Sequence, residues 1–360
     1  MHRKTIPQTD VLILRFSALG DIAMTAPVVR SYAQAYPNLS FVMTSVPMLE
    51  PLFAGIPNLK FEGIDTKEYN GILGIFRLYR RLHRFRPKQL LDLHQVLRTY
   101  LLCALFFLSG TTSIFGVKKG RRQRFQLTKA KGKRLQPIPS MISKYIDVFV
   151  RSGFLPFPIH HIPLNKRGAS TLLKLYSSAK GEQDIKKLEH EKWLGIAPFA
   201  KHPTKEWPVE RMERVVDQIG TSGKYRTFLF GGGTLERAML KNWELRYPNT
   251  VCVAGTLDFA QELTLMGKMD LFISMDSANM HFASFMGVPV LSIWGGTHPY
   301  AGFYGWRQDP NLAIQSQIKC RPCSVFGSKP CRLGTLACLQ EISVEEVLHR
   351  IEQFFADELH

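Results

Sequence analysis

Short apolar runs alternate along the chain with stretches of helical periodicity. In the first half, runs of strand character cover 11–16, 41–44, 89–93 and 113–117. A second series covers 193–198, 225–231, 251–254, 271–275 and 288–294, separated by helix-compatible segments such as 209–219 and 235–246. Strands that alternate with helices predict parallel sheets. Two Rossmann-like halves account for the two series better than one large sheet.

The chain length of 360 residues also suits two domains. Near the middle, a proline-containing stretch gives way to the polar segment 166–191, which has little strand character. We place the boundary near Leu164, which gives domains 1–164 and 165–342. The amphipathic stretch 343–355 predicts a terminal helix within 343–360, with Ser343 as its N-cap.

Ligands of open α/β sheets bind at the carboxyl ends of the strands, so the loops there are where chemistry is expected. The first such loop places Gly20 at the turn and Asp21 at the start of a helix. A carboxylate in that position can cap backbone N–H groups, or it can remove a proton from an acceptor hydroxyl. With one glycine, the loop lacks the three-glycine dinucleotide fingerprint.

Three loops of the second half carry residues suited to a phosphate ligand. Lys201 and Lys205 follow one strand, and a triple glycine with Glu236 follows the next. In the segment 275–281, small polar residues join a strand to a helix whose free N–H groups form an anion site, with Ser277 and His281 nearby. Each loop also has an explanation without a ligand. The lysines can simply be solvated, the glycines can form an ordinary turn, and His281 can be hydrogen-bonded within its helix.

Together these motifs resemble the lipopolysaccharide heptosyltransferase family. The resemblance rests on Gly20-Asp21, the Lys-Glu-Trp-Pro of 205–208, the triple glycine with Glu236, and the Asp-Ser-Ala-Asn-Met-His of 276–281 followed by Gly-Val-Pro. It implies the GT-B fold, in which two Rossmann-like domains face each other and a C-terminal helix crosses back to the first. It also implies a nucleotide-sugar donor mainly on the second domain, an acceptor mainly on the first, and neither metal nor cofactor.

The resemblance assigns roles by motif. Asp21 corresponds to the general base of a single, inverting displacement, and Lys205 to the lysine that stabilises the donor diphosphate. The implied donor-binding residues are Lys201, Glu236, Thr256, Leu257, Asp276, Ser277, Ala278, Asn279 and His281. The implied acceptor-binding residues are Ser17, Gly20, Asp92, Arg98, Arg121 and Arg122.

The implied reaction moves heptose from ADP-heptose to an inner-core lipopolysaccharide acceptor, either Kdo-lipid A or a core heptose. The family commonly has Thr-Gly after the donor-loop aspartate, where this chain has Ser277-Ala278. Another nucleotide sugar therefore remains an alternative donor. Two other functions compete with this one. The protein could be a sugar-nucleotide epimerase, or a non-catalytic protein that binds anionic lipid or nucleic acid.

The charge of the chain favours an anionic partner. Lys and Arg number 47 against 29 Asp and Glu, a net charge of +18. Nine of the seventeen residues in 118–134 are Lys or Arg, which suits lipid phosphates or a solvated loop, and 72–85 mixes Arg with apolar residues as interfacial helices do. No RNA-binding module accompanies these residues, so we expect an anionic membrane surface rather than nucleic acid as the partner.

The N-terminal sequence has no signal-peptide pattern. The longest apolar run of the chain, 100–108, is far short of the roughly 20 residues that cross a bilayer. We therefore expect a cytoplasmic protein that is peripheral on the inner face of the cytoplasmic membrane. Cys320, Cys323, Cys331 and Cys338 leave two alternatives open, a structural zinc site or free thiols.

Overall fold

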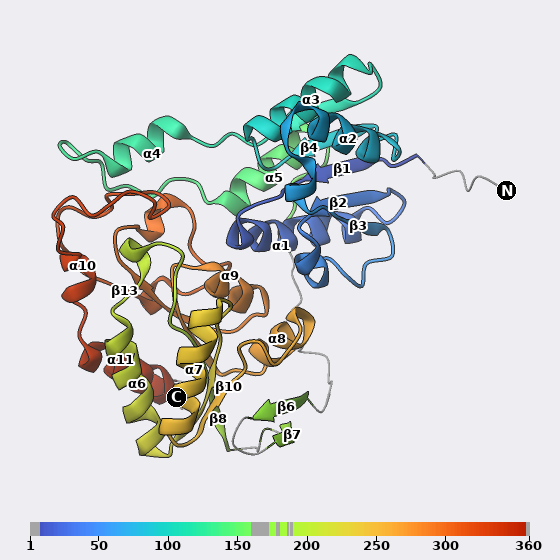
Figure 1. The fold of residues 1–360 in the computed structure, drawn as a ribbon. Helices are drawn as coiled ribbons and strands as arrows, with labels where there is room; N and C mark the ends of the chain where they lie inside the picture. Colours follow the sequence, from blue (N-terminus) through green and yellow to red (C-terminus); the bar gives the residue numbers. More distant parts are fainter. Residues whose placement is uncertain (1–7, 160–172, 178–180, 186, 188–189, 358–360) are drawn as a thin grey trace. The chain divides into compact units, whose positions relative to one another are not determined.

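The computed structural model describes residues 8–159, 173–177, 181–185, 187 and 190–357. The chain divides into two compact units (Figure 1). Unit 1 comprises residues 1–119 and 139–161, and unit 2 comprises residues 120–138 and 162–360. The expected boundary at Leu164 lies outside the described residues. Residues 120–138, which lie within the range expected for the first domain, make their contacts with unit 2.

The sheet of unit 1 has five parallel strands in the order β3-β2-β1-β4-β5. The strands are β1 (Val11–Leu14), β2 (Phe41–Ser45), β3 (Leu59–Gly63), β4 (Gln89–Asp92) and β5 (Ser113–Gly116). The chain runs from β1 outward to β3 and then returns to the other side of β1 as β4. This reversal of strand order creates a switch point between β1 and β4, where ligands of such sheets bind.

Helices cover both faces of this sheet (Figure 1). On one face, α2 (Gly71–His83) and α3 (Leu97–Leu108) contribute Leu78, Leu82 and Phe106 to a buried cluster with strand residues such as Leu12 and Leu90. Elsewhere in the unit, α1 (Leu19–Ala35) packs on α5 (Met141–Arg151), and the ring of Tyr32 stacks on that of Phe149 with centroids 4.1 Å apart. Strand side chains alternate between the two faces, so both faces supply core.

The sheet of unit 2 has six parallel strands in the order β10-β9-β8-β11-β12-β13. The strands are β8 (Lys192–Ala197), β9 (Tyr225–Leu229), β10 (Thr250–Cys252), β11 (Leu271–Met275), β12 (Val290–Trp294) and β13 (Ala313–Gln315). This is the order of a dinucleotide-binding sheet, with its switch point between β8 and β11.

One large core lies between this sheet and the helices α6 (Val209–Ser222), α7 (Thr234–Arg246), α10 (Ala337–Gln340) and α11 (Val344–Asp357). The helix α9 (Ala278–Phe285) packs on β11 and β12 and contacts α8 (Phe259–Met266). The terminal helix α11 packs against α6 and buries Val347 and Ile351 in the core. Its predicted start is confirmed, because the Ser343 hydroxyl accepts a hydrogen bond from the Glu346 backbone N–H at 3.0 Å.

The predicted class, two α/β domains with parallel sheets, is confirmed. Three differences concern short elements. The strands β3 and β13 were not predicted, since both lie at a sheet edge and neither is buried along its whole length. The polar stretch expected to lack strands contains an antiparallel hairpin of β6 (Leu173–Ser177) and β7 (Gly181–Ile185). Within the described part of the chain, no helix is long and apolar enough to cross a membrane.

Candidate active site

The loop after β1 holds a carboxylate in contact with a buried arginine. Asp21 lies in the first turn of α1, whose N-cap is Ala18, so Asp21 is not the cap of this helix. Its Oδ1 lies 2.9 Å from Nη2 of Arg15, and the two side chains are 17% and 6% exposed. The start of the helix favours a negative charge at this position. Asp21 is therefore an ionisable group held at the carboxyl end of β1 and still open to solvent.

Arg15 also joins this loop to the neighbouring strand. Its Nη1 donates to the backbone oxygen of Leu93, directly after β4, at 2.5 Å. The guanidinium is planar and presents its donors in a fixed fork, so two contacts in different directions fix its orientation. Arg15 thereby sets the position of the Asp21 carboxylate relative to the end of β4.

The loop after β4 is ordered by a buried carboxylate. Asp92 is fully buried, and its Oδ1 accepts hydrogen bonds from the backbone N–H groups of His94 and Gln95, both at 2.9 Å. Burial raises the pKa of the Asp92 carboxyl, while these hydrogen bonds act in the opposite direction. In this geometry Asp92 shapes the loop and presents no exposed atom to an acceptor.

His94 and Ser17 meet where the two loops adjoin. His94 Nε2 lies 3.0 Å from the Ser17 hydroxyl. Burial, together with the positive charges of Arg15, Lys119 and Arg98, lowers the pKa of the His94 imidazole to about 3. His94 is therefore neutral near pH 7 and can donate to or accept from a hydroxyl without adding charge.

The other residues expected on the acceptor side are more dispersed. Gly20 is half-buried in the first turn of α1. The Arg98 guanidinium donates to the backbone oxygen of Thr66 at 2.8 Å, which ties α3 to the segment before α2. Arg121 and Arg122 are exposed at the start of α4 (Arg121–Thr128), which belongs to unit 2.

The basic segment is folded rather than a solvated loop. The Arg124 guanidinium lies over the rings of Phe303 and Phe326, 5.1 and 5.4 Å from their centroids. Lys133 Nζ donates to the Cys320 backbone oxygen at 2.7 Å, and the Ile138 N–H donates to a backbone oxygen in the loop after β12. These contacts correct the expectation of a free loop, because they attach the segment to unit 2 by named side chains.

At the switch point of unit 2, a lysine pairs with a carboxylate. Lys205 ends a 3₁₀ turn in the loop after β8, and Asp276 follows β11 directly. Lys205 Nζ lies 2.9 Å from Asp276 Oδ2, and both side chains are largely buried. The sequence predicted each residue separately, and the structure brings them together because β8 and β11 are neighbours in the sheet.

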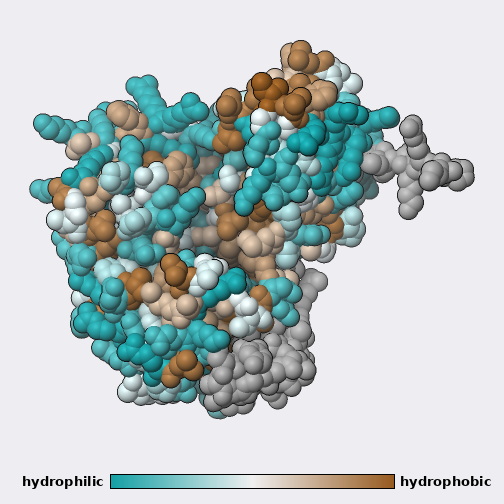
Figure 2. All heavy atoms as spheres, in the orientation of Figure 1, coloured by the Kyte–Doolittle hydropathy of each residue, from teal (hydrophilic) through white to brown (hydrophobic). Residues whose placement is uncertain are grey.

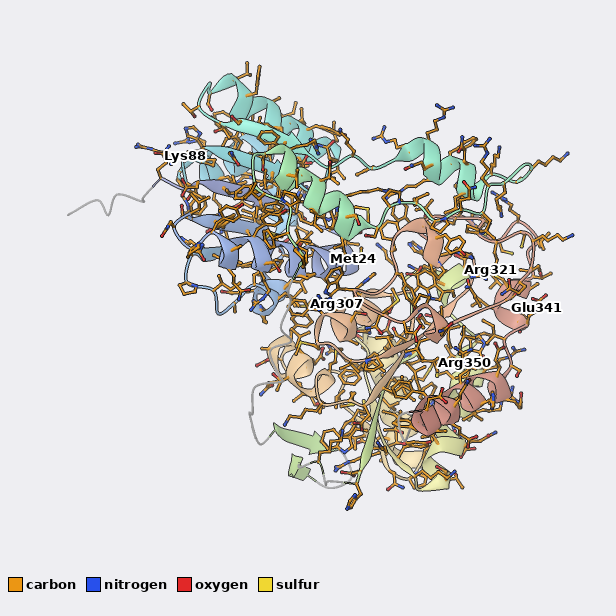
Figure 3. The ribbon with its side chains drawn as sticks, turned by 180° about the vertical axis from the view of Figure 1, so that it is seen from behind. Met24, Lys88, Arg307, Arg321, Glu341 and Arg350 are labelled. Carbon is orange, nitrogen blue, oxygen red and sulfur yellow. The ribbon has the colours of Figure 1, made fainter. Side chains whose placement is uncertain are left out.

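A third strand end supports this pair. The Thr297 hydroxyl, in the loop after β12, donates to Asp276 Oδ2 at 2.7 Å. That loop is held in turn by Arg321, which is buried and labelled in Figure 3. Arg321 Nε donates to the Gly295 oxygen at 2.5 Å and Nη2 to the Thr297 oxygen at 3.0 Å. Burial lowers the pKa of the Arg321 guanidinium to about 10.

The helix α9 begins at this edge. Its N-cap is Ser277, whose side chain makes no capping bond and whose hydroxyl lies 3.2 Å from that of Ser274. The half-buried residues Ser277, Ala278 and Asn279 form its start, so the first N–H groups of the helix lie beside Asp276. His281 is buried one turn further along the helix.

The remaining residues expected on the donor side lie in the next loops. Glu236 Oε2 accepts from the backbone N–H groups of Gly232 at 2.8 Å and Gly233 at 3.1 Å, so this carboxylate closes the glycine turn. Burial raises the pKa of the nearby Glu206 carboxyl, and the charge of Glu236 adds to the increase. Thr256 and Leu257 form the turn after β10, and Lys201 is exposed.

Sequence reasoning gave no individual role to Arg15, His94, Thr297, Arg321 and Glu206, although Glu206 lies within the Lys-Glu-Trp-Pro motif of 205–208. Arg15 and His94 each stand one or two residues past a strand end, and this was the available signal. Arg321 gave no such signal, because its partners lie in a loop more than twenty positions away.

Within the described residues, no group of three or more His, Cys, Asp or Glu side chains is placed to hold a metal ion. Cys320, Cys323, Cys331 and Cys338 are free thiols. Burial raises the pKa of the Cys323 thiol, and raises that of Cys338 to about 11. The zinc alternative gains no support from this geometry.

Comparison with known proteins places the chain in a family. Residues 75–332 match the family model described as glycosyltransferase family 9 (heptosyltransferase). Lipooligosaccharide heptosyltransferase 2 of Campylobacter jejuni is 22% identical and aligns with 93% of this chain and 96% of its own length. Lipopolysaccharide core heptosyltransferase OpsX of Haemophilus influenzae is 23% identical, with 81% and 80% covered.

Solved structures share the fold. The family 9 glycosyltransferase of Veillonella parvula matches with a TM-score of 0.69 at 19% identity, covering 97% of this chain and 98% of that one. ADP-heptose LPS heptosyltransferase II of Escherichia coli matches with a TM-score of 0.64 at 15% identity, covering 98% and 100%. Because the family model spans well over half of the sequence, the chain belongs to glycosyltransferase family 9, the heptosyltransferase family.

Proposed function

We propose that this glycosyltransferase moves heptose from ADP-heptose to an inner-core acceptor of lipopolysaccharide, Kdo-lipid A or a core heptose, with inversion at the anomeric carbon. Family membership and the names of the curated relatives support the sugar and the acceptor class. Structures of Escherichia coli heptosyltransferase WaaC contain ADP and ADP-2-deoxy-2-fluoro heptose, which supports the donor.

The observation that carries the proposal is the Asp21 carboxylate. Arg15 engages its Oδ1, and among the described residues its Oδ2 has no hydrogen-bond partner. In the proposed step, Oδ2 takes the proton of the acceptor hydroxyl as that oxygen attacks the anomeric carbon. The bond between the anomeric carbon and the diphosphate oxygen breaks in the same displacement, and ADP leaves.

On the donor side, we assign the diphosphate to Lys205 and to the N-terminus of α9. The lysine is a compact cation with three donors, and helix N–H groups favour anions. Asp276, held by Thr297, is then placed to accept from hydroxyls of the sugar. These groups would supply the positive charge that the leaving diphosphate needs, so we propose transfer without a metal ion.

The test of Asp21 uses a matched pair of substitutions in unit 1. Asp21→Asn removes the basic oxygen with little change in size, and should lower turnover by about 10²–10⁴-fold, the usual contribution of a general base. Binding of ADP, measured by calorimetry, should be unchanged, because the donor groups lie in the other unit. Asp147→Asn, on the exposed face of α5, is the control and should keep full turnover. Full turnover by the Asp21 variant would remove Asp21 from the mechanism.

The donor and acceptor are tested by mass spectrometry of the products. Lipid-linked inner core is incubated with ADP-heptose, and in parallel with UDP- and GDP-sugars, and the anomeric configuration of the product is read by NMR. We expect addition of one heptose from ADP-heptose, in inverted configuration and in the presence of a chelator. Transfer from another nucleotide sugar alone would reassign the donor, and isomerisation of the donor without acceptor would indicate an epimerase.

Because the proposed acceptor is an anionic lipid, we further propose that the protein works as a peripheral protein on the inner face of the cytoplasmic membrane. The net charge of +18 supports electrostatic attraction to such a surface. Fractionation of cells at low and high salt tests this location, since a peripheral protein is released from the membrane pellet as salt increases.

A further inference from the structure

The helix α3 is apolar on the side that faces solvent as well as on the side that faces the core. Leu102 and Phe106 are buried against the sheet, while Phe107 and Leu108 are 72% and 79% exposed. Its only charged residue is Arg98. A helix that is hydrophobic all round is normally buried, so an exposed one indicates a partner.

The neighbouring helix α2 extends this exposed surface. The two helices pack against each other, and the first turns of α2 expose Ile72, Leu73 and Phe76. Figure 2 shows hydrophobic side chains gathered over this part of unit 1. We call this surface the α2–α3 face. It consists of Ile72, Leu73, Phe76, Leu97, Tyr100, Leu101, Phe107 and Leu108.

The exposed residues follow helical spacing, so they lie on one side of each helix. On α3 the positions 97, 100, 101, 104, 107 and 108 recur every three or four residues, and all six are exposed. On α2 the exposed apolar positions 72, 73 and 76 precede Arg77 and Arg80, also exposed. The face thus has an apolar centre on α3 and a basic border on α2.

The charge around this face indicates which kind of partner it binds. Between Glu68 and Asp147 the sequence contains one acidic residue, Asp92, which is fully buried. Residues 69–119 contain nine Lys and Arg. Two copies of such a surface would repel each other, whereas an anionic bilayer offers phosphates for the arginines and hydrocarbon for the leucines and phenylalanines.

We infer that the α2–α3 face is the membrane-docking surface of this protein, with Leu97, Leu101, Phe107 and Leu108 entering the boundary between headgroups and acyl chains of an anionic leaflet. The inference rests on the proposed function, whose acceptor is a lipid. It differs from the expectation drawn from sequence, which placed lipid contact on α2 and on the basic segment of unit 2. The main apolar contact is assigned here to α3, beside the exposed apolar residues of α2.

The test is flotation of the purified full-length protein with vesicles. The vesicles contain phosphatidylethanolamine and phosphatidylglycerol, with phosphatidylcholine vesicles as the neutral comparison. The combined substitution Leu101→Ser, Phe107→Ser and Leu108→Ser should lower the partition coefficient on anionic vesicles by at least about tenfold, because apolar area no longer leaves water. The control is Leu245→Ser, at a leucine on α7 of unit 2 that is 62% exposed, and this variant should bind vesicles as the unchanged protein does.

A second pair separates the charge from the apolar contact. Arg77→Gln with Arg80→Gln should weaken binding to anionic vesicles and reduce its sensitivity to salt, while Lys241→Gln on α7 should not. Circular dichroism spectra that match those of the unchanged protein confirm that each variant is folded. Full vesicle binding by the folded triple-serine variant would overturn the inference.

Two further measurements distinguish this inference from other outcomes. Transfer to a deacylated, water-soluble acceptor should be the same in the triple-serine variant and in the unchanged protein. If neither protein transfers heptose, the proposed function fails, and the vesicle result still decides the docking surface. If sedimentation shows a dimer that the triple-serine variant loses, the face binds a second copy of the chain and the inference is wrong.

Discussion

Acid should destabilise unit 2 through one buried histidine, His298. This residue is the N-cap of the 3₁₀ turn Pro299–Ala301, and its Nδ1 accepts a hydrogen bond from the Tyr300 backbone N–H at 3.0 Å. Nδ1 must be unprotonated to accept this bond. Burial lowers the pKa of His298 to about 4, and the charges of Arg321 and Lys133 act in the same direction.

The size of the effect follows from the two pKa values. An unfolded histidine titrates near pH 6.5, so between about pH 6.5 and pH 4 the unfolded state binds more protons than the folded state. Stability therefore falls as pH decreases through this window. The loss is about 2 kcal/mol at about pH 5 and approaches about 3 kcal/mol below about pH 4. The side chain is largely buried, so solvent screening removes little of this amount.

The perturbation is His298→Asn. The asparagine side-chain oxygen takes the place of Nδ1 and remains a good cap, but it does not titrate. At about pH 8 the variant and the unchanged protein should have nearly the same free energy of unfolding. At about pH 5 the free energy of unfolding of the variant, compared with that of the unchanged protein, should be higher by about 2 kcal/mol than it is at about pH 8. Other titrating groups contribute equally to both proteins and cancel in the comparison.

Urea unfolding followed by tryptophan fluorescence is the assay. All five tryptophans lie between residues 193 and 306, so the signal reports unit 2. His349→Asn, an exposed histidine on α11, is the control and should follow the pH dependence of the unchanged protein. If the unchanged protein and His298→Asn lose the same stability between about pH 8 and about pH 5, the reasoning about His298 is refuted.

Three further substitutions test individual contacts. Gly195→Ala places a methyl group 2.3 Å from Phe272 Cδ2, which should cost about 1–3 kcal/mol of stability and lower the urea midpoint. Arg15→Met removes one partner of the largely buried ion pair with Asp21 and should lower the free energy of unfolding by about 3 kcal/mol. Thermal unfolding followed by circular dichroism measures this loss, and an unchanged midpoint would show that the ion pair does not stabilise the protein. Lys205→Met should lower transfer by about 10²–10³-fold and weaken ADP binding in calorimetry, and unaltered binding would remove this lysine from the donor site.

The sheets could be predicted because strands of a buried parallel sheet are nearly continuous apolar runs. The central strands β1 and β11 have this pattern and are buried at every position. By contrast β3, with burial at only two of its five positions, has no such run. The α3 helix shows another limit of prediction from sequence. An apolar run predicts a hydrophobic helix, but it does not indicate which side of that helix the rest of the fold covers.

Candidate site residues could be proposed from sequence where one loop carries its own signal, as Gly20-Asp21 and the segment from Asp276 to His281 do, and their roles stay predictions. Contacts between distant loops carry no such signal. Arg15 reaches the Leu93 oxygen seventy-eight positions away, and Thr297 reaches Asp276 across twenty-one. Such contacts exist because parallel strands bring their carboxyl ends to one edge, and only the strand order shows which ends are neighbours.

Each unit holds a carboxylate against a cation at its switch point, and the choice of cation fits the two proposed roles. Arg15 contacts Asp21 and a backbone oxygen in fixed directions, which would keep the proposed base in one position. Lys205 contacts Asp276 with one flexible ammonium group, which can turn toward a diphosphate when the donor binds. A proton acceptor needs a constant position, whereas a donor site must exchange one anion for another. Arginine beside the base and lysine beside the donor loop satisfy these two requirements.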